Sequence, residues 1–217
     1  MTSNIPIYLF PGMSAQFPIF HKLIPLLPTS TVIQYPTPAS GESLSHFAHR
    51  IAELLPSDCF VAGVSFGGIV AQEVARVIRA RACFLISSIR GLHELPPWLR
   101  VWRWIGTTNC QRLLNGVGRV AALFPAGLCT RSTLRLRKLS GASGVWYRWA
   151  TSAVLGWQPQ RTPPDVPLIQ IHGDADMTFP IRYTNPDIMV PNGLHALPVS
   201  HPEAVAKAIT TYIARTA

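Results

Sequence analysis

One serine of this sequence lies in a setting that could make its hydroxyl a nucleophile. Ser65 is the central residue of GVSFGG at 63–68, directly after an apolar run and before a segment with helical spacing. Nucleophilic catalysis at such a place needs a sharp turn from strand to helix, with small residues two positions before and after the serine. Gly63 and Gly67 meet this demand. Because G-x-S-x-G also occurs in plain glycine-rich turns, its place between a strand and a helix is what favours the catalytic interpretation.

A serine hydroxyl is a poor nucleophile at its ordinary pKa, so it needs a histidine base, which a carboxylate must orient. Two carboxylates follow an apolar run in IHGDADMTFP at 171–180. Asp174 lies beside a glycine in a tight turn, where aspartate often bonds to backbone N–H groups. Either carboxylate would stand at the carboxyl edge of the sheet, where open α/β sheets place their sites. Asp176 lies farther out, with Pro180 fixing the exit. We therefore favour Asp176 as the acid and keep Asp174 as the alternative.

The base is to be chosen among seven histidines. His195 lies in a loop, in GLHALP at 193–198, after the last short apolar run. His46 and His49 fall on the polar face of a helix, and His172 ends a strand, where a structural role is expected. His201 lies at the start of the last helix, where we expect a surface residue. The chain order Ser65, Asp176, His195 favours His195 as the base.

The elements around these residues alternate between short apolar runs and helical patterns. We expect strands at 5–10, 31–35, 59–64, 82–87, 167–172 and 187–190. Helical spacing covers 43–55, a segment that starts at Phe66, and a last helix that starts with a capping-box pattern at 200–203. The segment 17–27 is also helix-like, although Pro18 and Pro25 limit it. The strands are continuous apolar runs, as burial on both faces of a parallel sheet requires. The sequence thus predicts a doubly wound α/β fold with a mostly parallel sheet of about six strands.

In combination, these segments resemble the α/β-hydrolases. GVSFGG at 63–68 resembles the nucleophile elbow of that family, HGDADMTFP at 172–180 resembles its acid loop, and GLHAL at 193–197 with HPE at 201–203 resembles its base loop and final helix. FPGM at 10–13 resembles its oxyanion strip, usually written H-G-x, with a proline in place of the histidine.

The resemblance implies a serine hydrolase that works through an acyl-enzyme. Ser65 would be the nucleophile, His195 the base and Asp176 the orienting acid, and the backbone N–H groups of Met13 and Phe66 would bind the oxyanion. No metal or organic cofactor is implied. The core would comprise 1–90 and 165–217, and residues 91–164 occupy the place of the variable helical lid of the family.

The net charge of +9 is concentrated in the expected lid. Residues 91–164 hold nine arginines and one lysine against a single acid, Glu94, and they also hold all six tryptophans. The rest of the chain is neutral. Basic patches can bind nucleic acid, but this segment matches no nucleic-acid-binding motif, so we do not favour that function.

The lid composition suggests a substrate class. Trp98 and Trp102 would line an apolar acyl pocket, while the arginines attract an anionic acyl carrier by long-range steering. Two alternatives stay open: the segment rests on an anionic lipid surface, or the tryptophans simply pack on the core. We expect a carboxylic ester or thioester with an apolar acyl part.

Other functions remain open on the same scaffold. An acyltransferase, a hydroxynitrile-lyase-type enzyme and a non-catalytic protein that binds a small molecule would all fit this fold.

No apolar run reaches the 18 residues of a membrane span, and the first strand begins close to Met1, so we expect a soluble, cytoplasmic protein. The four cysteines form no C-x-x-C pair, and we expect Cys59 and Cys83 to be buried as small apolar residues.

Overall fold

The computed structural model describes residues 5–13, 17–104, 144–159 and 166–216 of the 217-residue chain. Six strands form one sheet with the order β2-β1-β3-β4-β5-β6, and every pair of neighbours is parallel. The strands are β1 Ile7–Phe10, β2 Ser30–Val32, β3 Phe60–Val64, β4 Ala82–Ile86, β5 Leu168–Gly173 and β6 Ile188–Val190. The doubly wound parallel sheet expected from the sequence is confirmed.

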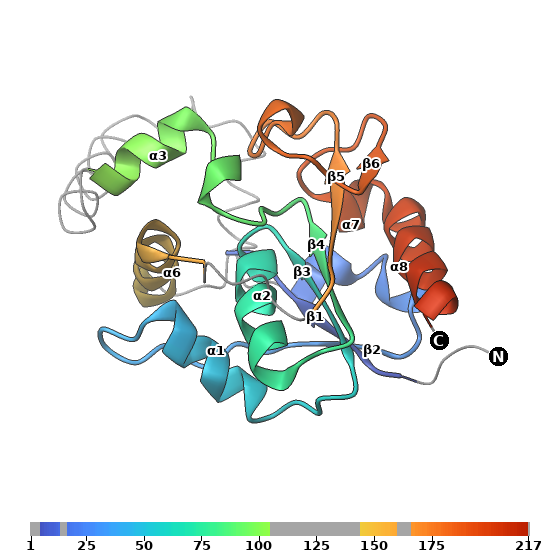
Figure 1. Cartoon of the computed structure of the whole chain (residues 1–217), viewed down its shortest axis with the longest axis horizontal. Helices are drawn as coiled ribbons and strands as arrows, with labels where there is room; N and C mark the ends of the chain where they lie inside the picture. The colour runs from blue at the N-terminus through green and yellow to red at the C-terminus, as the bar shows by residue number, and fades with distance from the viewer. Residues whose placement is uncertain (1–4, 14–16, 105–143, 160–165, 217) are drawn as a thin grey trace, which may run out of the picture.

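Helices cover both faces of this sheet. Figure 1 shows α1 and α2 on one face and α8 on the other. The described helices are α1 Leu44–Ala52, α2 Phe66–Ile78, α3 Pro97–Trp104, α6 Gly144–Gly156, α7 Leu197–Ser200 and α8 Pro202–Thr216. Four single turns of 3₁₀ helix accompany them: η1 Phe17–Phe20, η2 Ile24–Leu26, η3 Leu92–Glu94 and η4 Ile181–Tyr183.

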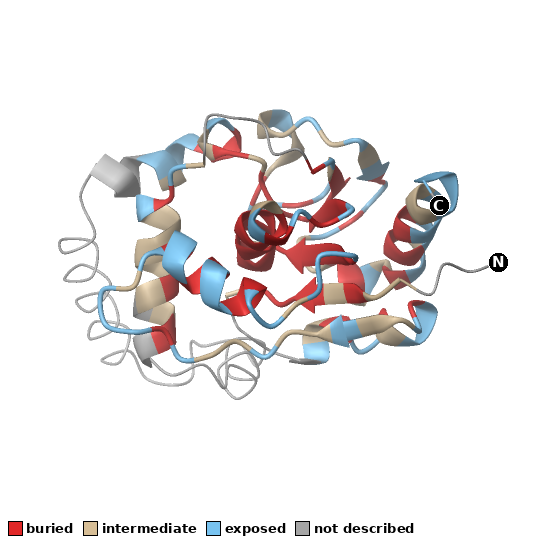
Figure 2. Ribbon diagram, turned by 60° about the horizontal axis from the view of Figure 1, so that its bottom comes forward, coloured by how far each residue is buried: buried red, intermediate tan, exposed pale blue. Residues whose placement is uncertain are grey.

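The sheet separates two apolar cores, because successive residues of a strand point to opposite faces. Val61 of β3 belongs to the core under α1, α2 and α6, whereas Phe60 and Ala62 belong to the core under α8 and the η1–η2 segment. All residues of β3 and β4 are buried. Figure 2 shows the same arrangement, with buried strands and α2 in the centre and exposed outer surfaces on α1 and α8.

Two local predictions from the sequence are wrong. The expected helix at 17–27 is replaced by η1 and η2, because Pro18 and Pro25 lack the N–H groups that a continuous helix needs. The capping box at 200–203 does not form, since Ser200 ends α7 and its hydroxyl donates to the carbonyl of Ala196.

The expected lid lies largely outside the described residues. Of the segment 91–164, the described elements are η3, α3 and α6, and α6 lies over the N-terminal end of α2 and beside α1 (Figure 1). None of the helices in the described ranges has the length and hydropathy needed to cross a bilayer.

Candidate active site

Ser65 occupies a strained turn between β3 and α2. Its φ of 54° and ψ of −123° lie outside the regions that L-residues prefer, and such a conformation costs about 1–3 kcal/mol. The turn is possible because Gly63 and Gly67 have no side chains. A Cβ added to Gly63 would come within 2.2 Å of the carbonyl oxygen of Gly67. The strand and the helix therefore meet backbone to backbone, and Ser65 stands at the carboxyl end of the sheet.

The strip after β1 packs against this turn. A Cβ added to Gly67 would lie 2.1 Å from the carbonyl oxygen of Phe10 and 2.4 Å from that of Pro11. A Cβ on Gly12 would lie 3.7 Å from the Cβ of Ser65. The segment that resembles an oxyanion strip thus runs directly beside the serine.

The structure brings the three residues predicted from the sequence together. The Nε2 atom of His195 lies 3.0 Å from Oγ of Ser65, and its Nδ1 atom lies 2.8 Å from Oδ2 of Asp176. A carboxylate can only accept a hydrogen bond, so Nδ1 carries the proton and Nε2 accepts from the serine hydroxyl. Asp174 is exposed, and its N–H donates to the carbonyl of Val190. Asp176 is the acid that meets His195.

Asp176 is buried, with 3% of its surface exposed. Its Oδ1 accepts from the backbone N–H groups of Thr178, at 2.8 Å, and Phe179, at 3.0 Å. Burial alone would raise its pKa, but hydrogen bonds from His172, His195 and the backbone, and the charge of His195, hold the pKa well below its usual range. The carboxylate is therefore ionised at neutral pH.

Two glycines bring the acid loop and the base loop into contact. A Cβ on Gly173, at the end of β5, would lie 2.1 Å from the carbonyl oxygen of Gly193. That carbonyl accepts from the N–H of Ala175 at 3.1 Å. Asn192 adopts a φ of 56°, which turns the chain after β6 back toward the acid loop. This backbone contact places His195 over Asp176.

A buried network of hydrogen bonds holds the backbone carbonyl of Ser65. The hydroxyl of Ser88 donates to the carbonyl of Ser65 at 2.6 Å. The side chain of Gln170 on β5 donates to the carbonyl of Ser88 and to Glu94, each at 2.8 Å. Glu94 also accepts from the N–H of Arg90. The sole acid of the basic segment thus anchors the start of that segment to the sheet.

The sequence matches no protein-family model, and no curated protein matches it. Among solved structures, it is similar to a thermophilic esterase from Thermogutta terrifontis, with 20% identity, a TM-score of 0.66, and coverage of 97% of this chain and 90% of that chain. It is similar to the RedJ thioesterase of the prodiginine biosynthetic pathway in Streptomyces coelicolor, with 19% identity, a TM-score of 0.60, and coverage of 96% and 90%.

A third similar structure, an epoxide hydrolase found in metagenomes from hot environments, is described as belonging to the α/β-hydrolase superfamily. It has 14% identity, a TM-score of 0.61, and coverage of 98% of this chain and 92% of that chain. The chain has the α/β-hydrolase fold.

Within this α/β-hydrolase fold, His172 has a contact that the sequence did not reveal. Its ring is fully buried. Its Nε2 donates to the carbonyl of Phe179 at 2.7 Å and lies 3.3 Å from Oδ2 of Asp176. The same carboxylate oxygen thus lies between two imidazoles. The signal in the sequence was the spacing of His172 and Asp176 around a tight turn, which lets the turn fold back onto the strand end.

The two tryptophans expected to line a pocket are placed differently from each other. Trp98 of α3 is 44% exposed and packs edge-on against Tyr183, with ring centres 5.8 Å apart. The side chain of Trp102 lies outside the described residues. Their role in an acyl pocket stays a prediction.

Other tryptophans of the same segment dock on the core. From α6 and the residue after it, Trp146 donates its indole N–H to the carbonyl of Met13, Trp149 to that of Glu42, and Trp157 to the carboxylate of Glu73. These contacts span 133, 107 and 84 positions of the chain, so no local pattern could have shown them.

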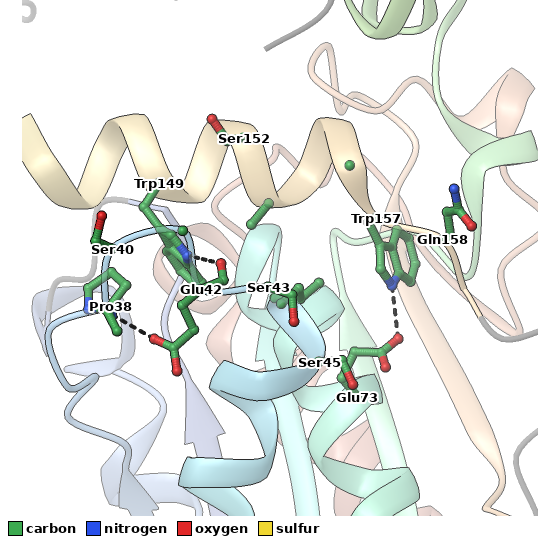
Figure 3. A pocket seen from close by; sticks show the side chains of 15 residues that line it. Pro38, Ser40, Glu42, Ser43, Ser45, Glu73, Trp149, Ser152, Trp157 and Gln158 are labelled. Atoms are coloured by element: carbon green, nitrogen blue, oxygen red, sulfur yellow. Dashed lines mark hydrogen bonds between the residues drawn. The ribbon is translucent and has the colours of Figure 1, made fainter. Parts of the chain in front are cut away.

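A cavity of about 680 Å³ lies between α6 and the loop before α1. Figure 3 shows Trp149 and Trp157 on its α6 side, with their hydrogen bonds to Glu42 and Glu73. Ser65 is not among its lining residues, so this cavity is separate from the candidate active site.

The described cysteines are poor rivals of Ser65 as a nucleophile. Cys59 and Cys83 are both buried, as the sequence led us to expect. Burial and the nearby Asp58 raise the pKa of Cys59 to about 11, and burial raises that of Cys83 further. Cys110 and Cys129 lie outside the described residues. Within the described ranges, no three His, Cys, Asp or Glu side chains gather in a way that could hold a metal ion.

Proposed function

We propose that the protein is a serine hydrolase that cleaves carboxylic esters or thioesters with an apolar acyl part. The observation that carries the proposal is the unbroken chain of contacts from Ser65 through His195 to Asp176, with the serine on a strained turn. A structural serine does not need this conformation, whereas a nucleophile gains exposure and alignment from it. The likeness in fold to an esterase and a thioesterase agrees with the proposal.

Acylation would begin with proton transfer from the Ser65 hydroxyl to Nε2 of His195, while Oγ attacks the acyl carbonyl. Asp176 holds the imidazole in the tautomer that can accept this proton and stabilises the cation that forms. The protonated His195 then gives the proton to the leaving alcohol or thiol. In the second half, His195 takes a proton from water, the resulting hydroxide attacks the acyl-enzyme, and Ser65 regains its proton.

The negative charge on the carbonyl oxygen would be bound by two backbone N–H groups. Phe66 is the first residue of α2, where N–H groups have no partner within the helix and the helix dipole favours an anion. Met13 supplies the second N–H, from the strip beside Ser65. One such donor is worth about 3 kcal/mol of transition-state stabilisation.

A Ser65→Ala variant tests the proposal. We would measure hydrolysis of a series of p-nitrophenyl esters and matched thioesters of increasing acyl length. We expect the wild type to hydrolyse the series with a pre-steady-state burst, and the variant to lose at least about 10³-fold in kcat, because catalysis without the nucleophile rests on binding and the oxyanion donors alone.

Labelling with a fluorophosphonate provides a second measurement. The wild type should be labelled on Ser65 alone. The matched control is Ser57→Ala, which changes an exposed serine in a loop and should keep both labelling and turnover. Full hydrolysis by Ser65→Ala would refute the mechanism, and cleavage without a burst or a labelled serine would favour chemistry of the lyase type.

A further inference from the structure

The strip of residues 11–13 is held from two sides by side chains outside it. The hydroxyl of Tyr35, in the loop after β2, donates to the carbonyl of Pro11 at 2.9 Å. The indole N–H of Trp146, on α6, donates to the carbonyl of Met13 at 2.6 Å. The two acceptors belong to the peptide groups immediately before and after the Gly12–Met13 peptide.

This arrangement leaves the Gly12–Met13 peptide little freedom to rotate. Peptide groups are planar, so fixing both neighbours restricts the rotations about Gly12 and Met13 that set the direction of the N–H between them. Gly12 is the residue where such rotation would otherwise be easiest, because it has no Cβ. Pro11 adds a fixed φ on the other side.

The side chains of the two donors, Tyr35 and Trp146, also pack against each other. The rings of Tyr35 and Trp146 are stacked, with centres 4.9 Å apart and planes 23° from parallel. Phe47 packs on both, at 5.8 Å and 5.9 Å, and Phe66 packs edge-on against Trp146 at 5.9 Å. Trp146 is 6% exposed. Burial raises the pKa of Tyr35 well above its usual value, so its hydroxyl keeps the proton that it donates.

We propose that Tyr35 and Trp146 form a clamp that aims the Met13 N–H at the developing oxyanion, so that both are positioning residues of the reaction. The inference rests on the proposed function, because it gives a purpose to the N–H of Met13. It adds that α6, a helix of the expected lid, is a working part of the catalytic centre through one indole N–H.

The clamp predicts a loss confined to the transition state. Tyr35→Phe removes only the hydroxyl, and Trp146→Phe removes the indole N–H while it keeps an aromatic ring in the cluster. A misaimed donor weakens binding of the oxyanion, which the ground-state substrate does not carry. We therefore expect kcat to fall by about tenfold or more in each variant, with KM within about twofold, since complete loss of one donor costs about 10²–10³ in kcat.

The matched control is Trp149→Phe. Trp149 lies on the same helix and packs on Phe66 and Trp146. Its indole N–H donates to the carbonyl of Glu42 at 2.8 Å (Figure 3), not to the strip. This variant removes one hydrogen bond that docks α6 and neither of the two clamp hydrogen bonds. It should keep kcat within about twofold of the wild type, with a fall in Tm close to that of Trp146→Phe.

The experiment uses the full chain and p-nitrophenyl butyrate, with active sites counted by fluorophosphonate titration so that kcat refers to folded, reactive Ser65. The second readout is the inhibition constant of an alkyl trifluoromethyl ketone, whose adduct with Ser65 carries the oxyanion. In Tyr35→Phe and Trp146→Phe this constant should rise by the same factor as kcat/KM falls, whereas it should not change in Trp149→Phe.

Two results would contradict the clamp. One of them leaves the proposed serine hydrolase function intact, and the other contradicts that function as well. Equal kcat and equal inhibition constants in Trp146→Phe and Trp149→Phe, beside normal Ser65-dependent hydrolysis, would remove the clamp and leave the proposed function intact. Absence of any Ser65-dependent hydrolysis or labelling in the wild type would remove both.

Discussion

At the scale of single residues, the acid of the candidate site is held by groups other than His195 as well. Asp176 accepts from two backbone N–H groups on one oxygen and faces two imidazoles on the other. The backbone bonds hold Oδ1, and Nε2 of His172 lies 3.3 Å from Oδ2. The carboxylate is thus fixed independently of the histidine that it orients.

Replacing this acid should separate orientation from binding. Asp176→Asn leaves a side chain of the same shape. Its oxygen should take the place of Oδ1, which accepts from two backbone N–H groups, so its NH₂ group faces Nδ1 of His195 and the imidazole loses the required tautomer. We expect kcat to fall by about 10⁴-fold, as the same change does in a Ser-His-Asp protease, with KM little changed. Asp174→Asn is the matched control and should keep kcat within about twofold. A large loss in that control, with activity retained in Asp176→Asn, would move the acid to Asp174.

The same substitution should alter stability at neutral pH and do so less in acid. The pKa of Asp176 is lower in the folded protein than in the unfolded chain, where it is about 4. Its contribution to stability is therefore complete above about pH 4 and is lost as pH falls toward the folded-state pKa. Urea unfolding at pH 7, 4 and 3 should show the difference in unfolding free energy between the wild type and Asp176→Asn shrinking with acid. A constant difference would contradict the depressed pKa.

At the scale of elements, the site depends on three places where backbones touch. The turn that carries Ser65 contacts the segment after β1 at Gly67. The end of β3 contacts the start of α2 at Gly63, and the loop after β5 contacts the loop after β6 at Gly173 and Gly193. In each case the contact is closer than any side chain permits. The loops that carry Ser65, Asp176 and His195 are therefore aligned by glycine positions as much as by the reacting groups.

A methyl group at the elbow should separate these elements. In Gly67→Ala the added carbon would lie 2.1 Å from the carbonyl oxygen of Phe10, a backbone atom that cannot turn away. We expect unfolding in urea to show a loss of about 1–3 kcal/mol, as overpacked sites do, together with loss of turnover. Gly156→Ala on α6, where nothing lies within 4 Å, should be neutral or slightly stabilising. Equal stability of the two variants would contradict the close contact.

Local patterns predicted the parallel sheet and the convergence of Ser65, Asp176 and His195, because strand ends, tight turns and chain order are visible over a few residues. They missed Tyr35 and Trp146, whose partners lie 24 and 133 positions away. They indicated helical spacing at 17–27 with Pro18 and Pro25 limiting it, but they did not show that only two short 3₁₀ turns would form there. Local patterns could not show which side chains contact residues that are far away in the sequence.

At the scale of the whole molecule, charge and chemistry are unevenly distributed. The neutral α/β body carries Ser65, Asp176 and His195, while residues 91–164 carry ten basic residues and one acid. The described part of this segment is tied to the site region, since Gln170, which donates to the carbonyl of Ser88, also donates to the carboxylate of Glu94. A positive field near a reaction centre attracts anionic substrates over distances of about 10 Å at ordinary salt.

If the basic segment steers substrate, as we propose, the reaction should depend on salt in a manner that varies with the charge of the substrate. For a thioester with an anionic carrier group, we expect kcat/KM to fall several-fold as NaCl rises from about 20 to 200 mM, because salt screens the long-range attraction. For a neutral ester of the same acyl chain, kcat/KM should stay constant.

Reversing the charge at Arg135 and Arg137, with Glu in each place, should reduce the salt dependence for the anionic substrate. The matched reversal Lys207→Glu on the exposed surface of α8 should leave it unchanged. Identical salt responses for the two substrates would mean that the basic segment does not steer substrate, and would favour its contact with an anionic surface instead.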